Sequence, residues 1–209
     1  MEHGAAANWR LACLLTLGAF LGLSVAAFAT GVLPGDLALR QELLEQHAGL
    51  AEQLARAANQ VGTWRVLLPA TVLLLALSRA ARRHWWLWCA VMMGSSLVEH
   101  GFKFVVGRPR PSGFSLGFPS GHSTAAATFA VVLIYIVTRE RLTPAQRHGI
   151  QVLAVVLMAL VGWARIVLHA HWPTDVLGGV LLGAGCAAAG AWWESTRLNA
   201  APSEAGRRA

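Results

Sequence analysis

The chain has 209 residues, of which 56% are hydrophobic and only 13% are charged. Soluble domains carry roughly a quarter of their residues as charged side chains, so this composition excludes an ordinary soluble domain and indicates a membrane protein. The formal net charge is +7, but the basic residues are dispersed between apolar stretches. Because they form no continuous patch, we expect no binding to nucleic acid.

Six uncharged apolar stretches predict six membrane-spanning helices. They occupy residues 11–30, 66–78, 85–98, 123–138, 150–164 and 176–193. The first and last approach the roughly 20 apolar residues that span a bilayer, whereas the shorter ones need polar ends that reach the interface or line a cavity. The first stretch lacks the basic start and cleavage site of a signal peptide, so we expect it to be retained. The predicted fold is an all-α integral membrane bundle forming one domain over 1–198, followed by a short polar tail at 199–209.

The distribution of basic residues predicts the orientation of this bundle. With six spans, both chain ends share one side, and ten of the 17 Lys and Arg residues fall on that side. The positive-inside rule therefore places both ends in the cytoplasm, where the arginines are expected to attract anionic headgroups. Four of the other seven basic residues lie in two short outward connections, against that rule, which indicates an anion-binding role for them.

The longest outward segment, residues 31–63, carries leucines at near-helical spacing. We expect one or two amphipathic helices there, which either border the entry of a lipid to a site or simply connect two spans. The three cysteines (Cys13, Cys89 and Cys186) lie in apolar stretches without pairing or ligand spacing. They are therefore expected to be packing residues.

The outward connection between the third and fourth stretches holds several unusual polar residues. Two prolines forbid helix continuation and present Lys103, Arg108 and Arg110 at the membrane edge. A few residues later, Ser120, Gly121 and His122 precede the fourth stretch. A helix that begins there offers free backbone N–H groups to an anion, and a histidine beside it can exchange protons.

The connection between the fifth and sixth stretches runs from Arg165 to Asp175. His171 and Asp175 are four residues apart at a helix start that Pro173 favours, so the carboxylate can orient the imidazole through Nδ1. Together the two connections supply cations for a phosphate, two histidines for nucleophile and acid, and a carboxylate to fix a tautomer. This set is complete for phosphoryl transfer without a metal or another cofactor.

These residues resemble the three signatures of the type 2 phosphatidic acid phosphatase superfamily, which also includes vanadium haloperoxidases. The signatures are Lys103 with six residues to Arg110-Pro111, then Pro-Ser-Gly-His at 119–122, then Arg165 with five residues to His171 and three more to Asp175. The third signature usually begins Ser-Arg, whereas Ala164 precedes Arg165 here. That departure removes one hydroxyl near the expected phosphate.

The resemblance implies a lipid phosphatase that works through a phosphohistidine. In it, His171 attacks phosphorus while Asp175 holds its ring, and His122 protonates the leaving oxygen. The implied phosphate-binding groups are Lys103, Arg110, Ser120, Gly121 and Arg165. No metal or other cofactor is expected. The expected substrate is a lipid phosphate or diphosphate, such as undecaprenyl diphosphate, phosphatidylglycerophosphate or phosphatidic acid, bound at the outer face of a bacterial cytoplasmic membrane.

Two neighbouring residues are secondary candidates for the site. Arg108 is expected either to contact the headgroup or phosphate, or to lie on the surface. Glu99 precedes Lys103 by four residues on the same predicted helix, so it is expected to be the ion-pair partner of that lysine rather than a catalytic group.

Other functions are compatible with the same residues. A lipid phosphotransferase or a lipid A phosphatase would use the same site. A non-catalytic protein that binds or transports lipid phosphates would need only the cations, and it leaves the spacing of His171 and Asp175 unexplained. Haloperoxidase activity is disfavoured because those enzymes are soluble. No pattern in the sequence indicates an oligomeric state.

Overall fold

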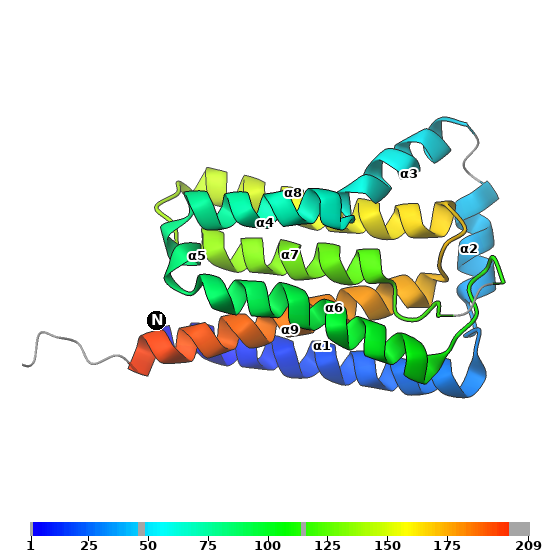
Figure 1. Cartoon of the computed structure of the whole chain (residues 1–209), viewed down its shortest axis with the longest axis horizontal. Coiled ribbons are helices and arrows are strands. Elements are labelled where there is room, and N and C mark those ends of the chain that lie inside the picture. Colours follow the sequence, from blue (N-terminus) through cyan, green and yellow to red (C-terminus); the bar gives the residue numbers. More distant parts are fainter. Residues whose placement is uncertain (1, 46–48, 114–115, 201–209) are drawn as a thin grey trace, which may run out of the picture.

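The computed structural model describes residues 2–45, 49–113 and 116–200, and residues 201–209 of the predicted tail lie outside this range. Over the described residues the chain forms nine helices and no strand (Figure 1). These are α1 (Glu2–Thr30), α2 (Asp36–Glu45), α3 (Leu50–Val61), α4 (Trp64–Leu77), α5 (Arg79–Arg83), α6 (Trp85–Val106), α7 (Gly121–Val137), α8 (Pro144–Val167) and α9 (Pro173–Ala200).

The six apolar stretches of the sequence fall in α1, α4, α6, α7, α8 and α9, which run along the length of the bundle (Figure 1). Three of these helices are long and apolar enough to cross a membrane, over Gly4–Thr30, Pro144–Val167 and Pro173–Leu198. The pair α3 and α4, which meet at 48°, would make a fourth span if they cross as one bent unit. The structure therefore confirms an all-helical membrane fold.

The helix boundaries follow from local sequence. Thr143 forms a capping box with Gln146, and Pro144 occupies the first position of α8, where its missing N–H costs nothing. Ser78 caps α5 by accepting a hydrogen bond from the Ala81 N–H. α6 ends at Gly107, whose φ of 60° lies in the left-handed region that glycine adopts most easily. The chain then turns into the connection that carries Arg108 and Arg110.

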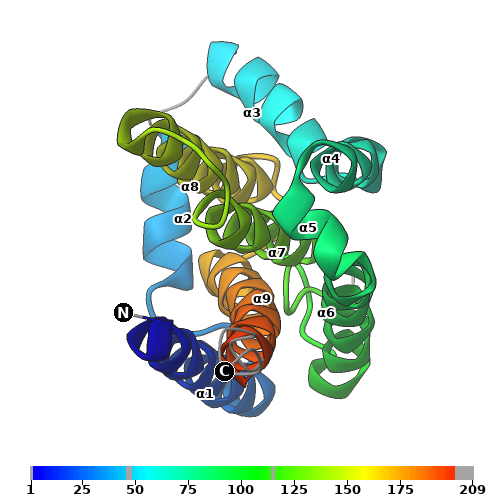
Figure 2. The ribbon, with the colours of Figure 1, turned by 90° about the vertical axis from the view of Figure 1, so that its left-hand side faces the viewer.

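Small residues bring α7 and α9 into close contact. A Cβ added at Gly179 would lie 2.5 Å from the carbonyl oxygen of Ser120, and one at Gly183 would lie 2.3 Å from that of Thr124. Only glycine allows this approach, so the spacing of these glycines serves helix packing, as small residues do in membrane bundles. Figure 2 shows α9 running inside the bundle beside α1 and α7. The start of α9 is thereby fixed against the start of α7.

Large apolar side chains cover the outside of the bundle. Leu15 of α1, Leu73 of α4 and Leu153 of α8 are each more than half exposed, and such extensive apolar surface favours contact with lipid rather than water. The first turn of α1 and the last turn of α9 lie at the same end of the bundle as α5, whereas α2 crosses the opposite end (Figure 1).

The segment 31–63 contains the two predicted helices, and both pack on the bundle. α3 buries Ala51 and Ala55 and exposes Leu50 and Leu54, so it is amphipathic as expected. Ala55 packs with Ala164 and Val167 of α8. The segment is therefore more than a connector, because it holds the start of α4 against the end of α8.

Candidate active site

A pocket of about 540 Å³ opens where α6 and α8 end and where α7 begins. Its wall contains six of the residues that the motifs single out, namely Lys103, Arg110, Gly121, His122, Arg165 and His171. Glu99 also lines the pocket, as do residues 62–65, which include the turn after α3 and the start of α4. Three segments that are distant in the sequence thus converge on one cavity.

His171 is almost fully buried in the connection between α8 and α9. Its Nδ1 lies 3.4 Å from Oδ2 of Asp175, and its backbone N–H donates to the carbonyl oxygen of Arg165 at 3.1 Å. Burial lowers the pKa of His171 to about 4, although the hydrogen bond to Asp175 acts in the opposite direction. The ring is therefore neutral near pH 7. Because Nδ1 faces Asp175, Nε2 is the nitrogen left for chemistry in the pocket.

Asp175 lies behind His171 in the first turn of α9, where the helix dipole favours a negative charge. Its Oδ1 accepts a hydrogen bond from Arg108 Nη1 at 2.7 Å, and its Oδ2 accepts one from the Trp172 N–H at 2.9 Å. Its carbonyl oxygen accepts the Ser120 N–H at 2.9 Å. The first two bonds fix the carboxylate and the third fixes its backbone, so Asp175 can hold the imidazole in one orientation.

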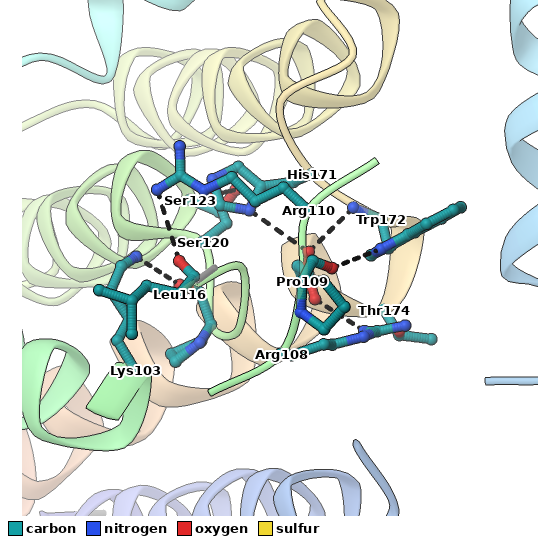
Figure 3. A network of polar contacts seen from close by, with 12 residues as sticks. Lys103, Arg108, Pro109, Arg110, Leu116, Ser120, Ser123, His171, Trp172 and Thr174 are labelled. Carbon is teal, nitrogen blue, oxygen red and sulfur yellow. Dashed lines mark hydrogen bonds and ion pairs between the residues drawn. The ribbon is translucent and has the colours of Figure 1, made fainter. Parts of the chain in front are cut away.

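Arg108 does not occupy the surface position that we predicted as one of two alternatives. Its side chain is fully buried and forms ion pairs with both Asp36 and Asp175. It also donates to Thr174 Oγ1 at 2.7 Å and stacks over the Trp172 ring, as Figure 3 shows for the labelled residues. A surface position is therefore wrong, because two buried carboxylates draw the guanidinium inward. Arg108 does not line the pocket, and a contact with phosphate stays a prediction.

Asp36 is a site residue that the sequence did not reveal. It stands at the start of α2 and is 1% exposed. Besides its ion pair with Arg108, it accepts hydrogen bonds from the Thr174 N–H at 2.9 Å and from Thr174 Oγ1 at 2.8 Å. An aspartate at a helix start is common as a cap, so nothing in the local sequence marked this one as a partner of the site.

Asn59 of α3 is a second residue of this kind. Its Oδ1 accepts a hydrogen bond from Arg165 Nη1 at 2.6 Å. This contact orients the guanidinium from the side of α3, and the expected amphipathic segment thereby reaches the site. Because the two residues are 106 positions apart, no local pattern connects them.

Lys103 forms the predicted ion pair with Glu99. Its Nζ also donates to the carbonyl oxygen of Pro119 at 2.8 Å, which ties the end of α6 to the start of α7. Glu99 has a further partner in His100, at 2.7 Å. The lysine is therefore held at the pocket wall, and Glu99 acts as the structural partner that the spacing predicted.

Arg110 is less constrained than Lys103. The only hydrogen bond of its side chain within the described residues is a long one, from Nη2 to the carbonyl oxygen of Leu116 at 3.4 Å (Figure 3). Most of its N–H groups are therefore left for an anion, and guanidinium groups suit phosphate oxygens in geometry and charge.

The start of α7 contributes Gly121 and His122 to the pocket. A Cβ at Gly121 would lie 2.9 Å from Oε1 of Glu99, so a side chain there would collide with the Glu99–Lys103 pair. Ser120, by contrast, is fully buried, and its Oγ accepts a hydrogen bond from Ser123 at 3.0 Å. Its hydroxyl lies behind the wall and supports the first turn of α7.

Comparisons with known proteins agree with this geometry. The model of the PAP2 superfamily matches residues 84–199, which include all the predicted site residues. Phosphatidylglycerophosphatase B of Bacillus subtilis (strain 168) is 28% identical over 173 residues, or 78% of this chain and 85% of that protein. The undecaprenyl-diphosphatase of Sulfolobus acidocaldarius is 28% identical over 137 residues, or 60% of this chain and 62% of that protein.

A solved structure also has this fold. The crystal structure of a transmembrane PAP2 type phosphatidylglycerolphosphate phosphatase from Bacillus subtilis superimposes with a TM-score of 0.75 at 25% identity, over 90% of this chain and 95% of that one. The family match covers more than half of the described chain. The protein is therefore a phosphatase of the PAP2 superfamily, the family that its three motifs predicted.

Proposed function

We propose that the protein hydrolyses a phosphomonoester or diphosphate of a membrane lipid through a phosphohistidine formed on His171. The observation that carries this proposal is the neutral, buried imidazole whose Nδ1 faces Asp175 and whose other nitrogen is left for a pocket lined by four basic side chains. A protein that only binds lipid phosphates has no need for a carboxylate behind a neutral histidine.

The reaction follows from the positions of the side chains. Burial and the neighbouring Arg165 lower the pKa of His122 to about 4, so it is the negative charge of the bound phosphate that favours its protonated form. Nε2 of His171 attacks phosphorus, the bond from phosphorus to the lipid oxygen breaks, and His122 gives its proton to that oxygen. His122, now neutral, then takes a proton from a water that attacks the phosphohistidine, and phosphate and free His171 are released. Lys103, Arg110 and Arg165 stabilise the charge on the phosphoryl oxygens in both steps.

The lipid headgroup is expected at the outer face of a bacterial cytoplasmic membrane, with six helices crossing. The first turn of α1 and the last turn of α9 lie at the same end of the bundle (Figure 1), which supports an even number of crossings. The majority of basic residues belong to that end, which supports a cytoplasmic location for it. The names of the relatives make phosphatidylglycerophosphate and undecaprenyl diphosphate the first substrates to test, followed by phosphatidic acid.

The decisive experiment is phosphate release by the purified protein in detergent with EDTA present, from each of these lipids. We expect release by the wild type, a loss of roughly 10²–10⁴-fold in His122→Ala, and no release above background in His171→Ala. His148→Ala is the matched control, because this exposed histidine lies near the other end of α8. Full activity of His171→Ala, or no release from any lipid, would overturn the proposal.

A lipid phosphotransferase is the second candidate, because the same phosphohistidine can pass its phosphoryl group to a lipid acceptor instead of water. Incubation with a labelled lipid diphosphate and an unlabelled acceptor, such as lipid A, separates the two functions. Label in free phosphate supports hydrolysis, whereas label in the acceptor lipid supports transfer.

A further inference from the structure

A second large pocket, of about 760 Å³, lies at the end of the bundle opposite to the active-site pocket. Four arginines line it. Arg79 and Arg83 come from α5, and Arg139 and Arg141 come from the connection between α7 and α8. Figure 1 shows α5 and this connection together at the end of the bundle that is remote from α2. We call this cavity the arginine pocket.

The carboxylates in the arginine pocket are already engaged with other groups. Glu140 accepts hydrogen bonds from Ser78 Oγ and from the Ala80 N–H at 3.0 Å. Glu194 is 3% exposed and pairs with Nδ1 of His84 at 2.7 Å. No salt bridge joins the four arginines to a carboxylate within the described part of the chain. The pocket therefore carries an excess of positive charge that attracts an anion.

An apolar groove of about 570 Å³ adjoins the arginine pocket and shares Glu140 and Arg141 with it. The groove runs between α4, α7 and the start of α8, and its wall includes Leu73, Leu77, Leu133 and Val137. A free anion would use the arginines alone. A molecule with an anionic head and a hydrocarbon tail would fill both cavities, which both border Arg141.

We propose that the arginine pocket and its groove bind one anionic phospholipid from the leaflet opposite to the active site. The phosphate of its headgroup lies among the four arginines, and one acyl chain lies in the groove against α4 and α7. General attraction of basic residues to the membrane surface explains charge at this end. It does not explain a pocket that is lined by α5, the α7–α8 connection and the end of α9 and that borders an apolar groove. This lipid is a ligand and not a substrate, because the groups of the catalytic pocket lie at the other end.

The test uses the full-length wild-type protein in a neutral detergent. Native mass spectrometry and thermal unfolding are followed with phosphatidylglycerol, with phosphatidylcholine, and with glycerol phosphate as the soluble headgroup. We expect phosphatidylglycerol to remain bound and to raise the unfolding temperature. Phosphatidylcholine, which has no net charge, should bind more weakly, and glycerol phosphate, which has no tail, should neither bind nor displace the lipid at the same concentration.

Two variants locate the site, and each has a control. Arg83→Gln combined with Arg141→Gln should weaken phosphatidylglycerol binding by about 25-fold, from about fivefold for each charge removed. Arg82→Gln is the matched control, because Arg82 lies on α5 beside Arg83 but donates to the carbonyl oxygen of Ala76 and does not line the pocket. Leu133→Trp fills the groove and should also weaken binding, whereas Leu21→Trp, on the exposed face of α1, should not.

Equal lipid binding by the Arg83/Arg141 double variant and by Arg82→Gln would overturn the proposal. Displacement of the lipid by glycerol phosphate would also overturn it, because the pocket would then be a site for soluble phosphate. Neither outcome depends on phosphatase activity, so failure here is distinct from failure of the proposed catalytic function.

Discussion

Arg108 Nη1 donates to Oδ1 of Asp175 at 2.7 Å, while the other oxygen of the same carboxylate faces Nδ1 of His171 at 3.4 Å. Arg108 also pairs with Asp36 at the start of α2. A buried series of charges therefore connects α2 to the imidazole that we propose as nucleophile. Within it, Arg108 and Asp36 are positioning residues, because they act through Asp175 and do not line the pocket.

Arg108→Gln should destabilise the protein strongly. Both carboxylates that it pairs with are fully buried, and removal of one partner from a buried ion pair costs about 3–5 kcal/mol because a buried charge remains uncompensated. Thermal unfolding in detergent measures this loss. Arg40→Gln serves as a control, because Arg40 lies near the same Trp172 ring but bonds to the exposed His169. Equal stability of the two variants would contradict the positioning role.

Asp36→Asn should lower kcat and leave KM unchanged. The substitution keeps the shape of the side chain but weakens its hold on Arg108 and Thr174, so Asp175 and His171 lose alignment, and small misplacements of reacting groups cost up to about 100-fold. Steady-state kinetics at several pH values separate this effect from simple unfolding. Glu42→Gln on the exposed face of α2 is the control. A raised KM with normal kcat would show instead that Asp36 acts on substrate binding.

The pH dependence of kcat/KM should reflect the low pKa of His171. Since burial lowers that pKa to about 4, the imidazole stays neutral as the pH falls from 7 and loses its nucleophilic lone pair only near pH 4. On the acid side of the profile, kcat/KM should therefore fall with a midpoint near pH 4, instead of near the ordinary histidine pKa of 6.5. The profile is measured with a monophosphate and with a diphosphate lipid, because the two substrates titrate differently. A midpoint at pH 6.5 with both would contradict this prediction.

Asp175→Asn should move this midpoint in a defined direction. The hydrogen bond and charge of Asp175 raise the pKa of His171, so their loss moves the midpoint to lower pH. The rate should also fall, by roughly 10⁴-fold, because the amide no longer fixes the productive tautomer. The pH profile of the residual activity distinguishes this electrostatic role from a purely structural one.

The sequence predicted the pocket wall well because the residues there belong to motifs with fixed spacing. Lys103 and Glu99 share one helix face, so helix geometry places them. His171 lies just before α9 and only four residues from Asp175 in its first turn, so the short spacing brings these two together. Asp36 and Asn59 could not be found in this way, since they meet their partners across 72 and 106 positions of the chain. The inward direction of Arg108 was missed for the same reason. Without knowledge of Asp36, an arginine beside the motif is expected to contact the headgroup or phosphate, or to lie on the surface.

Asn59→Ala should raise KM because Arg165 loses the acceptor that orients it. The hydrogen bond is short, at 2.6 Å, and joins α3 to the pocket. Loss of a hydrogen bond to a charged group costs about 1.5–3 kcal/mol. Because Arg165 binds the phosphate in the proposed site, this loss corresponds to roughly a tenfold to hundredfold rise in KM. Kinetics on a soluble phosphate ester and on a lipid measure this effect. Gln60→Ala, at the neighbouring exposed position, should leave KM unchanged.

Ala164→Ser restores the residue that usually begins the third motif, yet it should not improve catalysis. Ala164 is fully buried and packs against Ala55 of α3 and Val167, so an added hydroxyl would face α3 instead of the phosphate. A serine in a helix can bond to the carbonyl four residues earlier, and the change in stability should therefore stay within about 1 kcal/mol. KM should remain close to that of the wild type. Ala164→Val, which overpacks the same contact, should lower stability by about 1–3 kcal/mol and disturb Arg165 through α3. A clear fall in KM for Ala164→Ser would mean that the hydroxyl reaches the phosphate, and that α3 moves away from α8 when substrate binds.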